Sequence, residues 1–157
     1  MLNTDQKEFL ARPVSLWLAT ANGEKVPDLV RCTGVVVEDE TTLRCFFPEK
    51  FSARCRENIS SNATLSLYST CPITLAGYQY KGQAHEITPC TVEEVELQRT
   101  FCNAFTGILL KFGMDKEPLF NLFFGLPSYA LRIKVEHMFD QMPKPNTGKE
   151  ITNELNN

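Results

Sequence analysis

Long hydrophobic runs are missing from this sequence of 157 residues. A helix that crosses a membrane needs about 20 predominantly apolar residues in a row, and no segment approaches that length. The first residues, MLNTDQKEFLARP, carry charges where a secretory signal would have its apolar stretch. We therefore expect a cytoplasmic protein without a membrane partner.

An excess of positive charge is also missing. The chain carries 16 Lys and Arg against 19 Asp and Glu, which gives a net charge of -3. Proteins that attract nucleic acid through their overall field have the opposite balance, so we expect no nucleic-acid partner. The length and the 43% content of hydrophobic residues are typical of one globular domain with a sizeable core.

Clustered metal ligands and nucleotide-binding loops are absent as well. The six cysteines form no CxxC pair and stand at positions 32, 45, 55, 71, 90 and 102. This spacing argues against a zinc or iron–sulfur site and predicts buried free thiols in a reducing compartment. Neither a GxxxxGKS/T nor a GxGxxG loop occurs. We interpret His137 as a histidine of the core or its rim, and Trp17 as a core residue.

Alternating and β-branched segments predict about six strands. The segment 14–20 alternates and is followed by Asn-Gly, the strongest short-range hairpin signal. Further strands are predicted at 29–37, 43–47, 64–68, 73–87 and 128–139. Gly77 and Gly82 interrupt one of them, which indicates a bulge, a bend or the close approach of a ligand or another backbone. In the last strand one face is predicted to hold Tyr129, Leu131, Ile133, Val135, His137 and Phe139.

Short helices are predicted between and before these strands, at about 5–12, 51–60, from Thr91 onward and at 118–124. Thr91 and Glu94 have the pattern of a capping box, and the helix that follows carries an apolar stripe of Val95, Cys102, Phe105, Leu109 and Phe112. Hairpin-linked strands favour closure into an antiparallel barrel with helices outside it, since closure removes exposed edges. We expect a single domain at 1–140, with a helical insertion at about 91–125 and a polar C-terminal tail at 141–157.

Cations and a hydroxyl gather at the start of the helix predicted at 51–60, namely Lys50, Ser52, Arg54 and Arg56. A helix N-terminus offers free N–H groups and a partial positive charge, which favour an anion. Ser52 is a suitable N-cap, and Arg54 in the first turn is able to reach a phosphate oxygen. The alternative is a capped helix with ordinary solvated arginines, and the spacing alone leaves both interpretations open.

The order of these segments resembles the FMN-binding split β-barrel of the pyridoxamine 5'-phosphate oxidase family. The similar segments are LATANGEKVPDLVRC, LRCFFPEKFSARCRENISSNATLSLY, YQYKGQAHEI and ALRIKVEHMFDQMP. The resemblance implies a mainly β fold, a six-stranded antiparallel split β-barrel with flanking helices. It also implies FMN as the cofactor and a homodimer with FMN at its interface.

The resemblance assigns a role to several residues. Arg31 matches a basic residue that contacts the FMN phosphate and ribityl chain, and Ser52 and Arg54 match a serine and a basic residue that hold the phosphate. Phe46 and Phe47 match an aromatic pair beside the cofactor.

Other parts of the implied site are backbone or come from the second subunit. Cys32 and Thr33 lie on the strand whose backbone lines the isoalloxazine ring in such proteins. The strand from Tyr78 to Gln83 of the second subunit would complete the site.

Two features depart from the family pattern. Ala53 stands where a basic residue is common, and the chain after Phe139 has no Arg or His to grip pyridoxal phosphate as the true oxidase does. We therefore predict a flavin-dependent oxidoreductase that acts on a substrate other than pyridoxamine phosphate, with a nicotinamide or small reduced electron donor. The alternatives are a non-catalytic binder of flavin, haem or deazaflavin in the same fold, and a barrel whose site has decayed. No residue is assigned as a catalytic acid or base.

Overall fold

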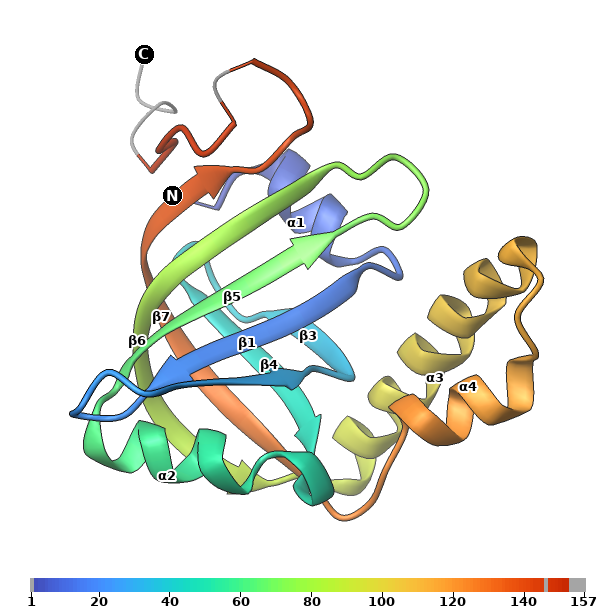
Figure 1. The fold of residues 1–157 in the computed structure, drawn as a ribbon, viewed down its shortest axis with the longest axis horizontal. Coiled ribbons are helices and arrows are strands. Elements are labelled where there is room, and N and C mark those ends of the chain that lie inside the picture. Colours follow the sequence, from blue (N-terminus) through green and yellow to red (C-terminus); the bar gives the residue numbers. More distant parts are fainter. Residues whose placement is uncertain (1, 146, 153–157) are drawn as a thin grey trace.

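The computed structural model describes residues 2–145 and 147–152. Within these residues the chain forms seven strands, four α-helices and two 3-10 helices (Figure 1). Their order is α1 (Thr4–Leu10), β1 (Ser15–Ala21), β2 (Pro27–Arg31), β3 (Gly34–Val37), β4 (Thr42–Pro48), η1 (Glu49–Phe51), α2 (Ala53–Ser61), β5 (Thr64–Thr70), β6 (Gly77–Pro89), α3 (Val92–Leu109), η2 (Leu110–Phe112), α4 (Lys116–Phe123) and β7 (Ser128–Asp140). The strands pair in the order β2-β1-β5-β6-β7-β4-β3, and every pair is antiparallel.

The single strand expected at 29–37 is two strands, which corrects the predicted count of six. The N–H of Cys32 donates to the carbonyl of Leu16 in β1 at 3.0 Å, whereas the N–H of Thr33 donates to Phe46 in β4 at 2.7 Å. The chain thus changes its pairing partner between two adjacent residues. Because β2 and β3 are the two ends of the strand order, this change curls the sheet into a barrel, of the split type that the sequence predicted.

A bulge in β7 changes which side chains face the core in the part of the strand after Val135. Lys81 pairs with His137, but the next residue of β6, Gly82, pairs with Val135, so Glu136 is an extra residue in β7. Leu131, Ile133 and Val135 are buried as expected, and beyond the bulge Met138 takes the buried position. The interpretation of His137 as a histidine of the core or its rim is therefore wrong. It is exposed, and its Nδ1 lies 2.8 Å from a carboxylate oxygen of Glu150.

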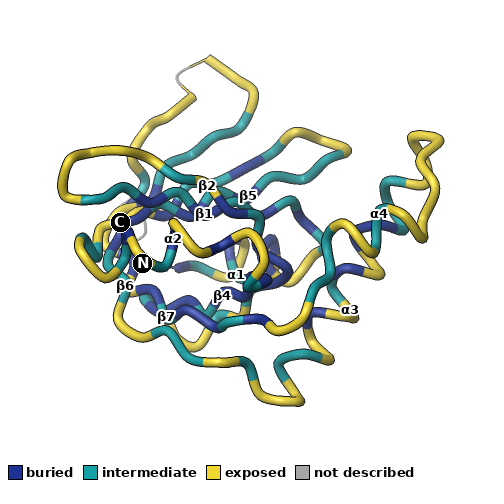
Figure 2. The backbone as a smooth tube through the Cα atoms, turned by 60° about the horizontal axis from the view of Figure 1, so that its bottom comes forward, coloured by how far each residue is buried: buried dark blue, intermediate teal, exposed yellow. Residues whose placement is uncertain are grey.

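The core fills the barrel, and the helices lie outside it. Figure 2 shows the buried segments along the strands, while α4 is only intermediate or exposed. Helix α2 runs across one end of the barrel and α1 lies near the other, whereas α3 and α4 project together on one side (Figure 1). No helix of the described residues is both long and apolar enough to span a membrane.

Helix α3 follows its sequence signals closely at its start and loosely at its end. Thr91 and Glu94 form the predicted capping box, each side chain accepting a hydrogen bond from the other residue's backbone N–H. Of the predicted stripe, Cys102 and Phe105 are buried, but Phe112 is 57% exposed. The last turn of this segment therefore extends beyond the barrel that the stripe packs against.

Candidate functional site

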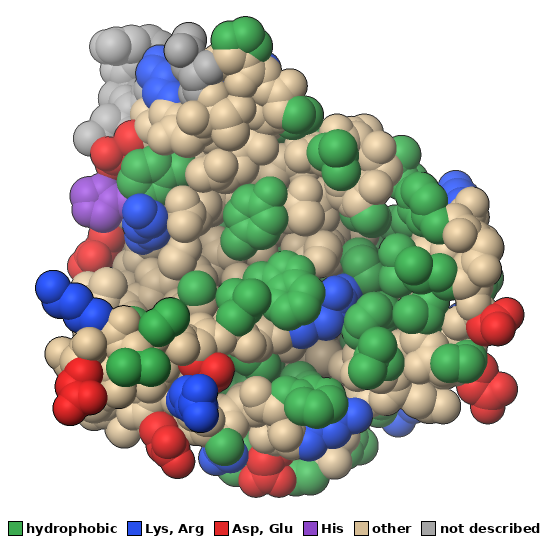
Figure 3. All heavy atoms as spheres, in the orientation of Figure 1, with side chains coloured by type: hydrophobic (Ala, Val, Ile, Leu, Met, Phe, Trp, Pro, Cys, Tyr) green, Lys and Arg blue, Asp and Glu red, His purple; other side chains and the backbone are tan. Residues whose placement is uncertain are grey.

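A cavity of about 430 Å³ lies between the barrel wall and α4. Its lining residues come from β1, β2, η1 and α4, and they are Trp17, Leu29, Val30, Arg31, Phe51, Leu122 and Phe123. Figure 3 shows hydrophobic side chains gathered on this face, over α3, α4 and the neighbouring strands, with Lys and Arg side chains among them. Arg31 is the one charged residue in the cavity wall.

The guanidinium group of Arg31 is surrounded by aromatic rings. Its Cζ atom lies 3.9 Å from the ring centre of Phe123, 4.6 Å from that of Phe105 and 5.5 Å from that of Trp17. Phe105 and Phe123 also contact each other edge to face, with ring centres 5.8 Å apart. These distances are within the range of cation–π attraction.

No carboxylate among residues 2–145 and 147–152 pairs with Arg31, and its guanidinium group contacts three aromatic rings. Burial lowers the pKa of its guanidinium, while the nearby thiols of Cys102 and Cys32 act in the opposite direction. A partly desolvated cation gains more from a counter-ion than an exposed one does, because the local dielectric is low. The cavity thus presents a positive group suited to an anion.

The start of α2 is adjacent to the cavity, because Phe51 lines it and α2 begins two residues later. Ser52 occupies the N-cap position, but its side chain makes no capping hydrogen bond within the described structure. Its hydroxyl is completely buried and donates to the carbonyl oxygen of Glu49 at 3.2 Å. The first N–H groups of α2 thus lack a side-chain acceptor, which leaves them available to an anion.

The other cations near the start of α2 do not line the cavity. Arg54 is exposed and does not line the cavity. Lys50 lies over the ring of Phe51, with Nζ 4.8 Å from its centre. Arg56 stacks on Tyr129 at 4.5 Å, and its Nε is buried without a hydrogen-bond partner among the residues described. Arg31 thus lines the cavity together with Phe51, whereas Lys50, Arg54 and Arg56 do not.

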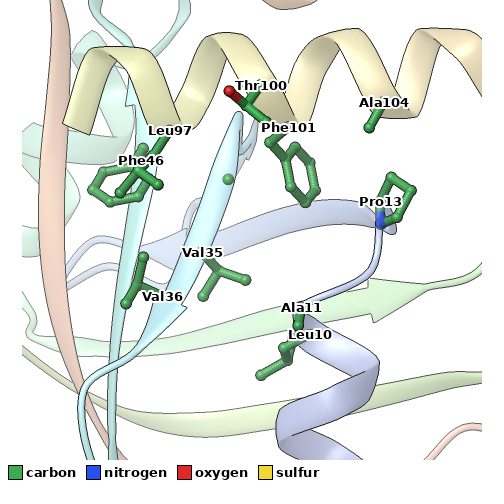
Figure 4. A pocket seen from close by; sticks show the side chains of 11 residues that line it. Leu10, Ala11, Pro13, Val35, Val36, Phe46, Leu97, Thr100, Phe101 and Ala104 are labelled. Atoms are coloured by element: carbon green, nitrogen blue, oxygen red, sulfur yellow. The ribbon is translucent and has the colours of Figure 1, made fainter. Parts of the chain in front are cut away.

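Phe46 and Phe47 lie away from this cavity in the single chain. Phe47 is fully buried in the barrel core, and Phe46 lines a second hollow of about 220 Å³ between α1, β3 and α3. Figure 4 shows this hollow with Phe46, Leu97 and Phe101 around it. Its lining includes no charged side chain, so it lacks the means to hold a phosphate.

Cys32 and Thr33 form the corner between β2 and β3, and both side chains are buried. Hydrogen bonding and coulombic interaction with Cys45, together with burial, raise the pKa of the Cys32 thiol well above its ordinary value. The hydroxyl of Thr33 donates to Gln98 Oε1 at 2.7 Å, and its carbonyl accepts from the Cys102 thiol at 3.7 Å. The corner beside Arg31 is therefore attached to α3.

Tyr78 and Gln83, which the resemblance assigned to a second subunit, do not line the Arg31 cavity of their own chain. The ring of Tyr78 packs edge to face on Phe9, with centres 5.1 Å apart. The side chain of Gln83 contacts Thr64 and Glu136. Their contribution to a site between two copies stays a prediction.

Three aromatic residues that contact the guanidinium of Arg31 were not predicted as site residues from the sequence. Trp17 was interpreted as a core residue, but it is only partly buried and lines the cavity. Phe105 and Phe123 lie in a helical segment whose role the sequence left open. The many phenylalanines at 101–124 were the one sequence feature that indicated an aromatic surface in this segment. Which of them contact Arg31 depends on how α3 and α4 pack. No group of three or more His, Cys, Asp or Glu in the described part of the chain is arranged to hold a metal ion.

No family model and no curated protein matches the chain. Solved structures do match it along most of its length. HupZ from Group A Streptococcus has a TM-score of 0.59 and 17% identity, over 95% of this chain and 99% of that one. A putative pyridoxamine 5'-phosphate oxidase from Lactobacillus delbrueckii has a TM-score of 0.55 and 16% identity, over 88% and 93% of the two chains. An FMN-binding protein from Syntrophomonas wolfei has a TM-score of 0.54 and 9% identity, over 85% and 82%.

Other structures with this fold belong to proteins with different functions. They include an F420 reductase and HutZ, the heme storage protein from Vibrio cholerae, each with a TM-score of 0.51. All these identities are below 20%, so the likeness shows a shared fold. The resemblance to the FMN-binding split barrel that the sequence predicted is confirmed at that level.

Proposed function

We propose that this chain binds FMN in the cavity beside Arg31 and acts as a flavin-dependent oxidoreductase. The observation that carries the proposal is Arg31 itself, a partly buried cation without an anionic partner in the described structure, in the wall of an aromatic cavity. Proteins of the same fold include an FMN-binding protein and a putative pyridoxamine 5'-phosphate oxidase, which supports a flavin as the ligand.

The residues of the cavity fit FMN in chemical kind. FMN carries a phosphate at one end of a flexible chain and a planar aromatic ring at the other. Arg31 and the uncapped start of α2 would hold the phosphate, with Arg54, in the first turn of α2 but outside the cavity wall, as a further cation. Trp17 and Phe51 would pack on the apolar parts of the ligand.

Bound FMN supplies the redox chemistry by accepting and returning a hydride or electrons, with a nicotinamide or a small reduced molecule as donor. The chain contributes binding, orientation and shielding from water. A second copy of the chain would cover the open side of the cavity, and Tyr78 and Gln83 of that copy would approach the ring. Pyridoxamine phosphate is not the proposed substrate, since the chain after Phe139 offers no Arg or His to bind it.

A non-catalytic binder in the same fold is the second candidate, and HutZ and the F420 reductase illustrate the ligands it would hold. Haem is the weaker choice within one chain. The sequence has two histidines, His85 and His137, and neither lines the Arg31 cavity. A haem iron held by histidine would need a ligand from elsewhere. Flavin and deazaflavin, which need no such ligand, both suit the cavity.

The first experiment is the visible absorption spectrum of the freshly purified protein, with the released chromophore identified by mass. Flavin bands together with the mass of FMN support the proposal, and reduction by a nicotinamide donor then separates an enzyme from a binder. A colourless protein that also fails to bind added FMN, F420 or haem would contradict both candidates.

Arg54→Ala tests the phosphate clamp. We expect the variant to bind FMN about tenfold more weakly, which corresponds to about 1.5 kcal/mol, the lower end for a charged hydrogen-bond partner because Arg54 is exposed. Riboflavin, which lacks the phosphate, should bind equally to both proteins. Arg99→Ala is the matched control, since Arg99 is a surface arginine that stacks on Phe124 outside the cavity. Equal FMN affinity of all three proteins would remove Arg54 from the clamp.

A further inference from the structure

The helical segment α3–α4 meets the barrel through Arg31. Phe105 comes from α3 and Phe123 from the end of α4, and the two rings lie against each other and against the guanidinium group of this one residue of β2. The contact therefore joins two elements that lie far apart in sequence from β2. It also sits in the cavity wall, because Arg31 and Phe123 both line the cavity.

The geometry of a guanidinium group explains what this contact does for anion binding. Its positive face stacks on aromatic rings, whereas its five N–H donors lie in the plane and point outward. A guanidinium group that packs against two rings keeps the N–H donors that point away from those rings free for a phosphate. An unrestrained arginine side chain would lose rotamer entropy when it binds, and a held one loses less.

A purely structural role for this contact explains the observations less well. An arginine that serves only to attach a helix is usually neutralised by a carboxylate, yet Arg31 has no anionic partner among the described residues. The other partly buried arginine next to α3, Arg44, shows the expected arrangement, with its Nε 2.5 Å from a carboxylate oxygen of Glu94. Arg31 is thus still able to bind an anion, whereas Arg44 is already paired with the carboxylate of Glu94.

We propose that Phe105 and Phe123 are positioning residues that hold the guanidinium of Arg31 with its N–H edge toward the cavity, so that it binds the phosphate of the ligand. This inference rests on the proposed function and extends it, because it gives the helical segment 91–125 a role in phosphate recognition. Phe123 acts through Arg31 and is therefore expected to discriminate phosphorylated from unphosphorylated forms of the same ligand.

The test compares Phe123→Leu, Phe123→Tyr and the control Phe120→Leu. Leucine keeps an apolar side chain of similar volume but has no π face, whereas tyrosine keeps the ring. Phe120 lies on the same helix, but its ring stacks on Phe124 with centres 5.2 Å apart and does not contact Arg31. None of these changes removes a core residue, since no residue of α4 is buried. All three variants should therefore fold.

Two readouts are measured on the full chain. The first is the NMR signal of the Arg31 side chain, whose protons are shifted by the neighbouring rings of Phe105 and Phe123. The second is the affinity for FMN, for riboflavin and for inorganic pyrophosphate. We expect Phe123→Leu to lose the ring-current shift and to bind FMN and pyrophosphate about three- to tenfold more weakly, the range of a cation–π contact. Riboflavin affinity should fall less than FMN affinity, because riboflavin has no phosphate for Arg31 to bind, although Phe123 also lines the cavity. Phe123→Tyr should restore both readouts, and Phe120→Leu should match the original protein.

The outcomes separate this inference from the proposed function. If FMN binds and Phe123→Leu binds it as tightly as the original protein, the positioning role is overturned and the FMN site stands. If FMN binds but Phe123→Leu leaves the NMR signal of the Arg31 side chain unchanged, the positioning role is overturned as well. If FMN does not bind while pyrophosphate still shifts the Arg31 signal in a Phe123-dependent way, the anion site stands and the flavin proposal fails. If neither molecule shifts it, both proposals are overturned.

Discussion

Of the eight glycines, Gly82 has the least room for a side chain. A Cβ atom there would overlap the carbonyl oxygen of Lys134 and lie 3.1 Å from the Cα of Val135, both of which are backbone atoms of β7. Of the meanings predicted for a glycine inside this strand, the structure shows two at Gly82, the close approach of another backbone and a bulge. Both occur where the register of β6 and β7 shifts.

We therefore expect Gly82→Ala to lower the free energy of unfolding by about 3 kcal/mol or more, because two paired strands would have to separate. Thermal unfolding should move down by at least about 6 °C for a chain of this size. Gly107→Ala is the control, since a Cβ there has nothing within 4 Å and the residue lies inside α3. That variant should gain about 0.5–1 kcal/mol. An unchanged unfolding midpoint for Gly82→Ala would mean that the close approach is wrong.

Asp39, in the turn between β3 and β4, gives a prediction about pH. The N–H and the hydroxyl of Thr41 donate to its carboxylate at 2.6 and 2.9 Å, and these hydrogen bonds lower its pKa from the ordinary 3.8 to about 2. The stabilisation from a lowered pKa is complete above the ordinary value and is lost as the pH falls through the folded value. The difference in unfolding midpoint between the original protein and Asp39→Ala should thus shrink between pH 4 and pH 2. A difference that stays constant over this interval would show that Asp39 does not titrate in the turn.

At the scale of elements, a buried glutamine fastens α3 to the barrel. Gln98 is completely buried, accepts the hydroxyl of Thr33 at 2.7 Å and donates to the hydroxyl of Ser128 at 3.1 Å. Its amide also donates to the carbonyl of Glu94 one turn earlier, at 3.1 Å. A single side chain thus links α3 to the β2–β3 corner next to Arg31 and to the start of β7.

Gln98→Leu should lower the free energy of unfolding by about 2–4 kcal/mol, because it leaves the buried hydroxyls of Thr33 and Ser128 without this partner. Val92→Ala on the same helix, where the side chain is 77% exposed, should change it by no more than about 0.5 kcal/mol. Urea unfolding of the two variants measures both effects. Equal stability of Gln98→Leu and the original protein would mean that α3 is attached mainly by its apolar contacts.

Elements whose signals are local could be predicted from the sequence. The capping box of Thr91 and Glu94 depends on residues three positions apart, and it lies where the sequence placed it. Two features depend instead on the strands that pair with them, namely the division of 29–37 into β2 and β3 and the bulge at Glu136. No pattern within either segment predicted them. The same limit applies to the site. The start of α2 carries a local signal and Arg31 was assigned by the family resemblance, whereas Phe105 and Phe123 reach Arg31 only through the packing of α3 and α4.

At the scale of the whole molecule, the cavity opens onto an apolar face. Leu29, Phe51 and Leu122 line the cavity and are 56%, 58% and 55% exposed. Leu126, in the segment between α4 and β7, is 55% exposed. Figure 3 shows how such side chains gather on this side of the molecule. Contiguous exposed apolar surface of this kind is typical of interaction sites. A second copy of the chain placed there would cover the cavity and shield a bound ring from water.

This arrangement predicts a homodimer that depends on the same surface as the cofactor. Sedimentation should give twice the chain mass of 17.8 kDa. Leu122→Glu should shift the protein to the monomer, because dimer formation would then bury two unpaired carboxylates. Val92→Glu, which adds the same charge at a position outside the cavity, should stay dimeric. If FMN lies between the copies, Leu122→Glu should lose FMN in proportion to the loss of dimer, and raising the protein concentration should restore both. A monomeric variant that keeps its full FMN affinity would place the cofactor within one chain, and a monomeric original protein would contradict the dimer itself.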